Sequence, residues 1–468
     1  MTSVAARHDT TGSADDAAAT AVARLRATFR SGRTRSVEWR IDQLNRISAL
    51  LAEREPDIAA ALADDLGRPA HYAWLGDIAS TAAEATYAAK HLRKWARRRR
   101  TALPLSMLPG RGFYQYEPLG VVLVIGPWNY PVYLTLAPLV ASLAAGNVSV
   151  VKPSEHAPAT SELLAQLLPQ YLDPDAVAVL QGDAAVTQSV LAQGVDMAFF
   201  TGGPAIGKKV MEAASAHLTP VILELGGKSP VIVTSDADID IAARRIAWVK
   251  LLNSGQTCIA PDYVLVEDAV RDRLVARISA AMTEFQRGEP ATQRIVDDRQ
   301  FARLAGLLDG HGGRVVHGGA TAPGSTAIEP TVIVDPAPDS AVMADEIFGP
   351  ILPVLTVGSL DEAIAFVNER PKPLGLYLFT GSKAVRERVL AETSSGGVVV
   401  NHLAMHCLVP QLPFGGVGNS GMGAYHGEWG FQALSHRKAV LAKPAKPDPA
   451  LLYPPYTATK MKLLRRFL

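Results

Sequence analysis

Cys258 is the residue in this sequence best suited to covalent chemistry. It lies in Asn253-Ser254-Gly255-Gln256-Thr257-Cys258-Ile259-Ala260-Pro261, just after a predicted helix. The nearby Gly and Pro favour an accessible turn, and a thiolate is a nucleophile whose reactivity depends on its pKa and exposure. For an isolated cysteine the alternative is a small buried hydrophobic side chain. The segment therefore predicts a reactive thiol and leaves that alternative open.

Glu224 is the second candidate, in Leu223-Glu224-Leu225-Gly226-Gly227-Lys228-Ser229-Pro230. Apolar neighbours raise the pKa of a carboxyl group, which would suit a general base, and the two glycines would permit close approach of a cofactor. A salt bridge with Lys228 at a hinge is an equal alternative at this point.

Two further segments have features of a dinucleotide site. Gly202-Gly203-Pro-Ala-Ile-Gly207 follows a strand ending at Thr201 and opens a predicted helix, Ala205–Ala216, whose free N–H groups would suit phosphate. A strand-to-helix turn also needs glycine for steric reasons alone. Lys152 and Glu155 end the second predicted strand, within reach of a ribose. The alternative is an exposed helix start with Ser154 as its N-cap.

The second cysteine, Cys407, is expected to be a bystander. His402 and His406 lie near it in the sequence, but two histidines and one cysteine make an incomplete metal site. We therefore expect no metal centre.

The elements that must position these residues alternate between strand and helix after Gly120. Nearly continuous apolar strands separated by helical segments predict right-handed βαβ units and parallel sheets covered on both faces. The strands expected are Gly120–Gly126, Val148–Lys152, Ala176–Gln181, Met197–Thr201, Val231–Thr234, Tyr263–Glu267, Arg314–His317, Thr331–Val334, Ile351–Val357, Leu376–Thr380 and Gly397–Asn401. Helices are expected between them, for example at Pro131–Ala145 and Ile239–Leu252.

The predicted fold class is α/β, with two doubly wound domains and a small oligomerisation arm. Residues 1–105 and 120–224 would form the Rossmann-like cofactor domain, residues 225–430 the catalytic domain, and residues 106–119 and 431–468 the arm. The basic run Arg97–Arg100 is expected to be a solvated helix end.

Composition excludes several classes of protein. The 468 residues include 46 Lys+Arg against 45 Asp+Glu, a formal charge of +1, which gives no basic field for nucleic acid. The segment Met1–Asp16 lacks the pattern of a secretory signal, and the apolar stretch Pro131–Gly146 is too short and interrupted to span a membrane. With only two cysteines, a disulfide scaffold is not expected, and the predicted location is the cytoplasm.

Taken together, the segments resemble the aldehyde dehydrogenase superfamily, and most of all its class 3 branch of fatty-aldehyde and aromatic-aldehyde enzymes. The resemblance runs from about residue 20 to the C-terminus and rests on seven ordered motifs: GPWNYP at Gly126–Pro131, VVKPSE at Val150–Glu155, FFTGG at Phe199–Gly203, LELGGKSP at Leu223–Pro230, NSGQTCIAPDY at Asn253–Tyr263, DEIFGPILPV at Asp345–Val354, and PFGGVGNSGMGAYHG at Pro413–Gly427.

The resemblance implies roles for individual residues in the oxidation of an aldehyde to a carboxylic acid with NAD or NADP. Cys258 would attack the aldehyde to give a thiohemiacetal and then a thioester, and Asn129 would donate to the oxyanion. Glu224 would activate the water that hydrolyses the thioester, with Glu346 as an alternative base in the class 3 branch. The implied cofactor contacts are Trp128, Lys152, Glu155, Gly202, Gly203, Gly207, Leu225, Gly226, Glu346 and Phe348.

One departure from the family pattern concerns the phosphate turn. The family usually has Ser after the first glycine, where this chain has Gly203. Loss of one hydroxyl donor predicts cofactor binding weaker by about 0.5–1.5 kcal/mol.

Two other activities compete with this interpretation: a cysteine hydrolase using Cys258 with His402 or His406, and acyl transfer to coenzyme A, which the presence of Glu224 disfavours. A catalytically silent relative is disfavoured by the intact Cys258, Glu224 and Asn129.

The expected partners are a small-molecule aldehyde and a second copy of the chain. The resemblance implies a domain-swapped homodimer in which the segment after Gly430 adds to the neighbour's sheet. For the basic tail Lys460–Leu468 we favour a short capping helix, with weak peripheral contact with membranes as the alternative.

Overall fold

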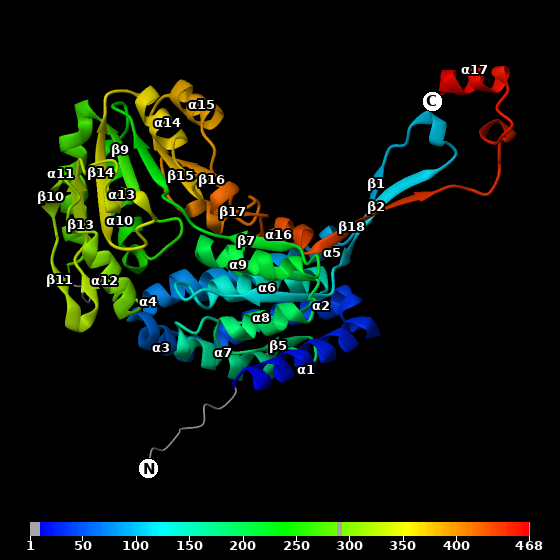
Figure 1. Ribbon diagram of the computed structural model, residues 1–468, viewed down its shortest axis with the longest axis horizontal. Helices are drawn as coiled ribbons and strands as arrows, with labels where there is room; N and C mark the ends of the chain where they lie inside the picture. The colour runs from blue at the N-terminus through cyan, green and yellow to red at the C-terminus, as the bar shows by residue number, and fades with distance from the viewer. Residues whose placement is uncertain (1–9, 288–292, 468) are drawn as a thin grey trace, which may run out of the picture.

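The computed structural model describes residues 10–287 and 293–467, which form two α/β lobes and a projecting arm (Figure 1). The first lobe holds a six-stranded sheet in the order β17-β7-β6-β3-β4-β5. Its strands are β3 (Val121–Ile125), β4 (Val148–Lys152), β5 (Val177–Val179), β6 (Met197–Thr201), β7 (Val221–Glu224) and β17 (Gly421–Met422). All neighbours are parallel except β17, which pairs antiparallel to β7.

Helices cover both faces of this sheet. They are α1 (Thr10–Ser31), α2 (Val37–Glu53), α3 (Glu55–Leu66), α5 (Ala79–Trp95), α6 (Tyr133–Ala145), α7 (Pro158–Tyr171), α8 (Ala184–Ala192) and α9 (Pro204–Ser215). Because both faces are covered, β3 and β4 are buried along their whole length. Every residue of α6 is buried as well, which explains why its sequence is apolar apart from Thr135 and Ser142.

The second lobe holds a seven-stranded sheet in the order β10-β13-β14-β9-β8-β15-β16. Its strands are β8 (Pro230–Val233), β9 (Tyr263–Glu267), β10 (Arg314–His317), β13 (Thr331–Val334), β14 (Ile351–Val357), β15 (Gly375–Phe379) and β16 (Gly397–Val400). Its helices are α10 (Ile239–Leu251), α11 (Asp268–Phe285), α12 (Asp298–Gly306), α13 (Ala341–Ala344), α14 (Leu360–Asn368) and α15 (Lys383–Glu392). Aspartates at the N-caps of α10 and α12 accept backbone N–H groups, which sets where these helices begin.

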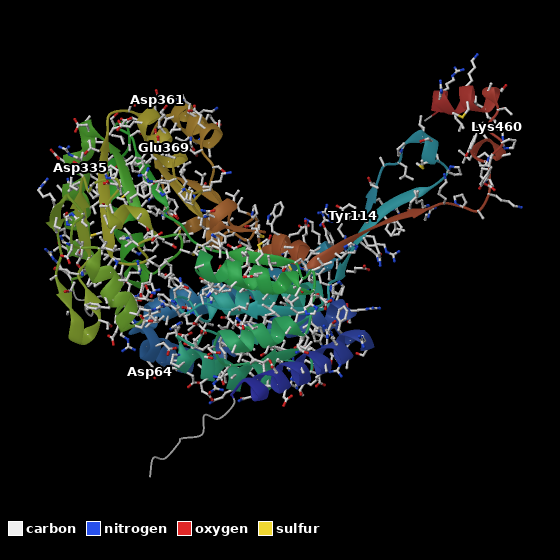
Figure 2. All side chains as sticks on the ribbon, in the orientation of Figure 1. Asp64, Tyr114, Asp335, Asp361, Glu369 and Lys460 are labelled. Carbon is white, nitrogen blue, oxygen red and sulfur yellow. The ribbon has the colours of Figure 1, made fainter. Side chains whose placement is uncertain are left out.

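The arm is a three-stranded antiparallel sheet of β1 (Arg99–Thr101), β2 (Arg111–Pro118) and β18 (Ser435–Ala442). It extends away from both lobes and ends in α17 (Ala458–Phe467). In Figure 2, Tyr114 lies on the arm and Lys460 at its far end. In the described residues, no helix has the length and apolar character needed to cross a membrane.

The predicted α/β class with two sheets is confirmed, and three local expectations are corrected. The basic run at Arg97–Arg100 is not a helix end, because α5 stops at Trp95 and Arg99 begins β1. The helix expected from Pro131 starts at Tyr133. Residues 421–430, which the sequence placed in the second domain, and residues 431–433, which it placed in the arm, return to the first lobe: β17 joins its sheet and α16 (Gly427–Ala433) packs on α5 and α6. Leu468, the last residue of the predicted tail, lies outside the described residues.

Candidate active site

The topology brings the carboxyl edge of the first sheet against the amino edge of the second. In parallel sheets ligands bind beyond the carboxyl ends of the strands. Trp128 and Asn129 follow β3, Lys152 ends β4, Gly202 follows β6, and Glu224 ends β7. Only five residues separate Glu224 from the start of β8, and Cys258 and Glu346 precede β9 and β14. The motif residues therefore gather between the two lobes.

The glycine turn after β6 has the properties of an anion cradle. A Cβ on Gly202 would lie 2.5 Å from the Phe200 ring and one on Gly207 2.8 Å from Leu225, so these two glycines are needed for packing. A Cβ on Gly203 would meet nothing within 4 Å. Gly203 is the N-cap of α9 and makes no side-chain cap; Pro204 has no N–H, and the Ile206 and Gly207 N–H groups donate to the Gly203 carbonyl oxygen, so the Ala205 N–H of the first turn is left for a ligand.

Lys152 and Glu155 form an ion pair at the end of β4, with Lys152 buried and the Glu155 side chain 39% exposed. Partial burial favours a higher pKa for Glu155, but the hydrogen bond and charge of Lys152 outweigh it and lower that pKa. The competing interpretation, a helix with Ser154 as N-cap, is wrong, since α7 begins at Pro158 with Ala157 as its N-cap. The pair is thus a charged feature beside the glycine turn.

Two aromatic rings contact each other across the boundary between the lobes. Trp128 and Phe348 meet edge to face with ring centroids 5.4 Å apart. Phe348 has a positive φ of 50°, a strained backbone that holds its ring in this position. Together with the open turn and the ion pair, these rings make a cradle whose chemistry fits a dinucleotide.

Glu224, which is buried, and Glu346, which is half-buried, are two acids in the same corner of the site. A Cβ on Gly226 would lie 2.1 Å from the Glu346 carboxylate, so Glu346 lies directly over the Leu225-Gly226 backbone. Neither oxygen of Glu224 has a hydrogen-bond partner among the described residues. Burial raises the pKa of Glu224 well above its ordinary value, and burial with the nearby Asp262 charge raises that of Glu346 to about 8.

The alternative salt bridge between Glu224 and Lys228 is wrong. Lys228 instead pairs with Asp262, and its ammonium also donates to the Val342 and Asp345 carbonyl oxygens, each at 2.9 Å. Asp262 in turn accepts the Ile347 N–H at 2.8 Å. This buried pair therefore holds the segment that carries Glu346 and Phe348 and leaves Glu224 free to act on a ligand.

Cys258 lies on the wall of a pocket of about 210 Å³. The preceding turn, Leu252–Gly255, has left-handed backbone at Asn253, Ser254 and Gly255. A Cβ on Gly255 would lie 2.2 Å from the Gly349 carbonyl oxygen, so only glycine fits there. The pocket is lined largely by apolar and aromatic side chains, among them Tyr133, Leu134, Trp248, Ile259, Met405 and Phe414.

The electrostatics around Cys258 favour the neutral thiol in the unliganded protein. Burial raises the pKa of Cys258 well above its ordinary value, with further contributions from the Glu346 and Glu224 charges. A base must therefore take the thiol proton before or during attack on a substrate. The sequence placed Cys258 correctly in an accessible turn but could not supply this electrostatic setting.

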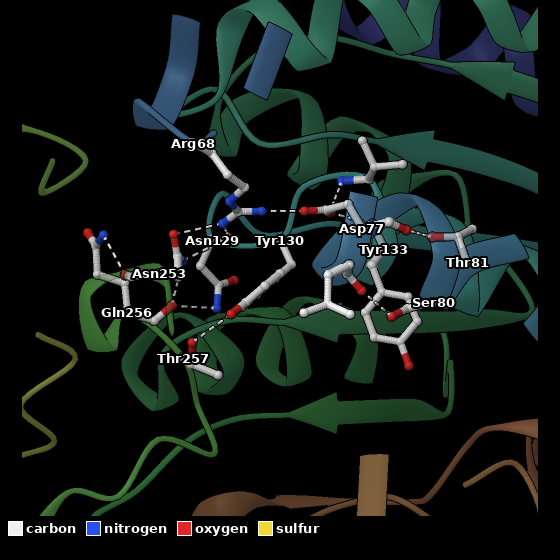
Figure 3. Close-up of polar contacts among 12 residues, drawn as sticks. Arg68, Asp77, Ser80, Thr81, Asn129, Tyr130, Tyr133, Asn253, Gln256 and Thr257 are labelled. Carbon is white, nitrogen blue, oxygen red and sulfur yellow. Dashed lines mark hydrogen bonds and ion pairs between the residues drawn. The ribbon is translucent and has the colours of Figure 1, made fainter. Parts of the chain in front are cut away.

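Asn129 lies next to the Cys258 turn (Figure 3). Its side-chain amide donates to the Gln256 carbonyl oxygen at 3.1 Å. Tyr130, the next residue, shares a hydrogen bond of 3.0 Å with the Thr257 hydroxyl. The turn after β3 and the turn before β9 are thus joined at the point where the nucleophile emerges.

Cys407 and its histidines do not form a metal site. Cys407 lines the same pocket as Cys258, but burial raises the pKa of its thiol to about 12. Burial lowers the pKa of His406 to about 4, and neither His402 nor His406 is in the pocket wall. Within residues 10–287 and 293–467 no group of three or more His, Cys, Asp or Glu side chains is arranged to hold a metal.

Sequence reasoning missed two buried groups beside the pocket. His426 lines it, with Nε2 3.4 Å from the Tyr133 hydroxyl and Nδ1 3.5 Å from the Glu84 carboxylate. Arg68 also lines it and reaches Asn129 and Asn253. His426 falls within the glycine-rich motif that ends at Gly427, whereas Arg68 carries no local signal for this site because Asn129 and Asn253 lie 61 and 185 residues away.

Comparison with known proteins agrees with this site. A family model described as Aldehyde dehydrogenase family matches residues 4–440. Aldehyde dehydrogenase family 3 member A2 of Rattus norvegicus is 45% identical over 453 residues, 96% of this chain and 93% of that protein. Aldehyde dehydrogenase, dimeric NADP-preferring, also of Rattus norvegicus, is 45% identical over 93% of this chain and 97% of that protein.

Among solved structures, the substrate-bound state of Staphylococcus aureus AldH superposes with a TM-score of 0.92 at 40% identity, covering 96% of this chain and 98% of that one. Sequence, fold and the arrangement of Cys258, Glu224 and the glycine turn lead to one conclusion. The chain belongs to the aldehyde dehydrogenase family.

Proposed function

We propose that Cys258 is the nucleophile of an NAD(P)-dependent oxidation that converts an apolar aldehyde to its carboxylic acid. The observation that carries this proposal is the position of Cys258 beside an apolar pocket and two acids. The thiol lines the apolar pocket, and the charges of the half-buried Glu346 and the buried Glu224 also act on it. A thiol so placed can hold a substrate carbonyl between an apolar recognition site and a dinucleotide.

Cys258 loses its proton to a neighbouring base, and its sulfur then adds to the aldehyde carbon to give a thiohemiacetal. The developing oxyanion accepts hydrogen bonds from the Asn129 amide and the Cys258 backbone N–H. Each such preorganised donor is worth about 3–4 kcal/mol in comparable sites. When bound, NAD or NADP supplies the hydride acceptor, and its contacts would be Trp128, Lys152, Glu155, Gly202, Gly203, Gly207, Leu225, Gly226, Glu346 and Phe348.

Loss of hydride leaves a thioester on Cys258, and water must then supply the second oxygen of the acid. Glu224 is the proposed base because both its oxygens are unpartnered among the described residues, and burial, which raises its pKa, makes its carboxylate a stronger base. The water attacks the acyl carbon, the carbon–sulfur bond breaks, and the Cys258 thiolate is regenerated. Glu346, with a pKa raised to about 8, is a second base in the same corner.

The experiment that tests this proposal compares the two cysteines. Cys258→Ser should abolish aldehyde-dependent reduction of NAD or NADP, whereas Cys407→Ser, at the other cysteine in the same pocket, should leave it nearly unchanged. Turnover that persists in Cys258→Ser would refute the assignment. A requirement for added coenzyme A in the native enzyme would instead favour acyl transfer over hydrolysis.

We also propose that the arm makes a homodimer. β18 and β16 are free edge strands of their sheets, and the exposed arm carries large apolar side chains including Leu105, Leu441 and Tyr456. Pairing β18 with the β16 edge of a partner subunit would cover both edges. Val440→Pro within β18 should shift the protein to monomers in light scattering, whereas Lys443→Pro, outside the strand, should not.

For α17 we propose a role within this dimer rather than at a membrane. The helix is short and exposed and carries Lys460, Lys462, Arg465 and Arg466. Sedimentation with anionic vesicles tests this: binding to the vesicles at moderate salt would favour peripheral membrane contact instead.

A further inference from the structure

Arg68 is a buried cation at the meeting point of three chain segments. It follows α3 and is only 1% exposed. Its guanidinium is ion-paired with Asp77, which lies in a single π-helical turn, Trp74–Ile78, and is fully buried. Asp77 also accepts the backbone N–H groups of Val132 at 3.1 Å and Tyr133 at 2.9 Å. The ion pair thus ties the N-terminal helices to the start of α6.

The other arm of the guanidinium reaches the two turns that form the active site (Figure 3). One guanidinium nitrogen of Arg68, Nη2, donates both to the Asn129 carbonyl oxygen and to Asn253 Oδ1, and the second of these distances is 2.7 Å. The Asn253 amide nitrogen then donates to the carbonyl oxygens of Asn129 and Gln256, both at 3.0 Å. Arg68 therefore contacts one turn directly and the other through Asn253.

The orientation of both amides in this network is determined by chemistry. A guanidinium cannot accept a hydrogen bond and a carbonyl oxygen cannot donate one. The Asn253 oxygen must therefore face Arg68, and the Asn129 nitrogen must face Gln256. One of the two N–H groups of Asn129 is held by Gln256 at 3.1 Å, which leaves the other for a substrate oxygen.

We propose that Arg68, anchored by Asp77, is a positioning residue for the oxyanion site: its guanidinium fixes Asn129 and Asn253, and through them the amide and the turn that present donors to the substrate oxygen. This inference rests on the proposed function, in which Asn129 and the Cys258 N–H hold the oxyanion.

The backbone of the nucleophile turn explains why such a clamp is needed. Asn253 and Ser254 both have φ of 51°, in the left-handed region that side chains with a Cβ occupy at a cost. Such a backbone persists only where surrounding contacts determine it. The contacts of Asn253 with Arg68, Asn129 and Gln256 supply that constraint four to five residues before Cys258.

A second link runs through Tyr130. The Arg68 guanidinium carbon lies 4.6 Å from the centroid of the Tyr130 ring, and the Tyr130 hydroxyl is 3.0 Å from that of Thr257. A lysine at position 68 would keep a charge for Asp77 but would lose the planar fork and the stacking surface. Arg68→Lys is therefore a variant that tests geometry rather than charge.

A double-mutant cycle between Arg68→Lys and Asn129→Ala tests the proposal. The readout is Cys258-dependent hydrolysis of p-nitrophenyl acetate, which passes through an oxyanion without needing the cofactor. In the native background Arg68→Lys should lower kcat/KM about 10- to 100-fold, as expected for displaced catalytic groups. In the Asn129→Ala background the loss should be smaller by about threefold or more, because the group being positioned is absent.

Two controls separate positioning from general damage. Arg93→Lys, at an exposed ion pair with Glu38, should leave kcat/KM within about twofold of the native value. In Arg68→Lys the Kd of NAD should stay within about twofold of the native value. The residues proposed to hold the cofactor make no hydrogen bond to Arg68, Asn129 or Asn253 among the described residues.

The proposal would be overturned if the loss of kcat/KM caused by Arg68→Lys differed by less than threefold between the native and Asn129→Ala backgrounds. Native kcat/KM in Arg68→Lys would also overturn it. If Arg68→Lys does not fold, Asn253→Gly replaces it in the same cycle with the same criterion, since glycine tolerates the left-handed backbone. Failure of the proposed function is distinguishable, because it would appear as hydrolysis and oxidation that survive Cys258→Ser.

Discussion

Gly203→Ser should strengthen the binding of NAD and NADP. Gly203 has φ −73° and ψ 150°, a backbone that any residue adopts, and a Cβ there would meet nothing within 4 Å. The substitution therefore adds a hydroxyl at the N-cap of α9 without strain. One additional hydrogen bond to a phosphate oxygen should contribute about 0.5–1.5 kcal/mol, which lowers Kd about 2- to 13-fold.

Gly203→Ala is the matched control, since it fills the same space without the hydroxyl. Fluorescence titration of both variants with NAD and NADP measures the effect, and thermal unfolding without cofactor separates helix capping from ligand binding. Binding by Gly203→Ser that equals or falls below that of Gly203→Ala would refute the reasoning. It would mean that the phosphate does not approach the N-cap of α9.

Two further predictions concern the buried acids. Because burial raises the pKa of Glu224 well above its ordinary value, hydrolysis of the acyl-enzyme should speed up as pH rises through that raised pKa and the carboxylate forms. Glu224→Gln should remove that rise from the pH–rate profile, and a rise that persists at the same pH would transfer the base role to another group, Glu346 first. Asp262→Asn should lower the free energy of unfolding in urea by about 3–5 kcal/mol. The substitution breaks a buried ion pair and leaves the Lys228 ammonium without its opposite charge. Asp240→Asn, at an exposed pair, should change it by less than about 1 kcal/mol, and equal effects of the two variants would contradict this account.

Features with a local signal were predictable from the sequence. The continuous apolar run at β3 predicts a buried strand, and this strand is buried because helices cover both faces of its sheet. Gly202 and Gly203 followed by Pro204 predict the start of a helix after β6. The steric need for each of the three glycines in this turn could not be told from the sequence. The structure separates Gly202 and Gly207, which are needed for packing, from Gly203, which is not.

Features that depend on pairing between distant residues were not predictable. Lys228 lies four residues from Glu224 but pairs with Asp262, 34 residues away, because β8 and β9, which these two residues precede, are neighbouring parallel strands of the second sheet. Arg68 and Asn253 are 185 residues apart and meet only after both lobes have folded. The basic run near Arg99 reads as a helix end, yet it forms β1 because β2, which follows a short loop, supplies a strand for it to pair with.

In the proposed mechanism the substrate becomes covalently attached to Cys258 before water releases it. The most direct test is to mix Glu224→Gln with an apolar aldehyde and NAD, quench in acid from milliseconds to minutes, and map the peptides by mass. The peptide containing Cys258 should gain the mass of the aldehyde less two hydrogen atoms as NADH appears. NADH formation with no acyl group on Cys258 at any time would contradict it.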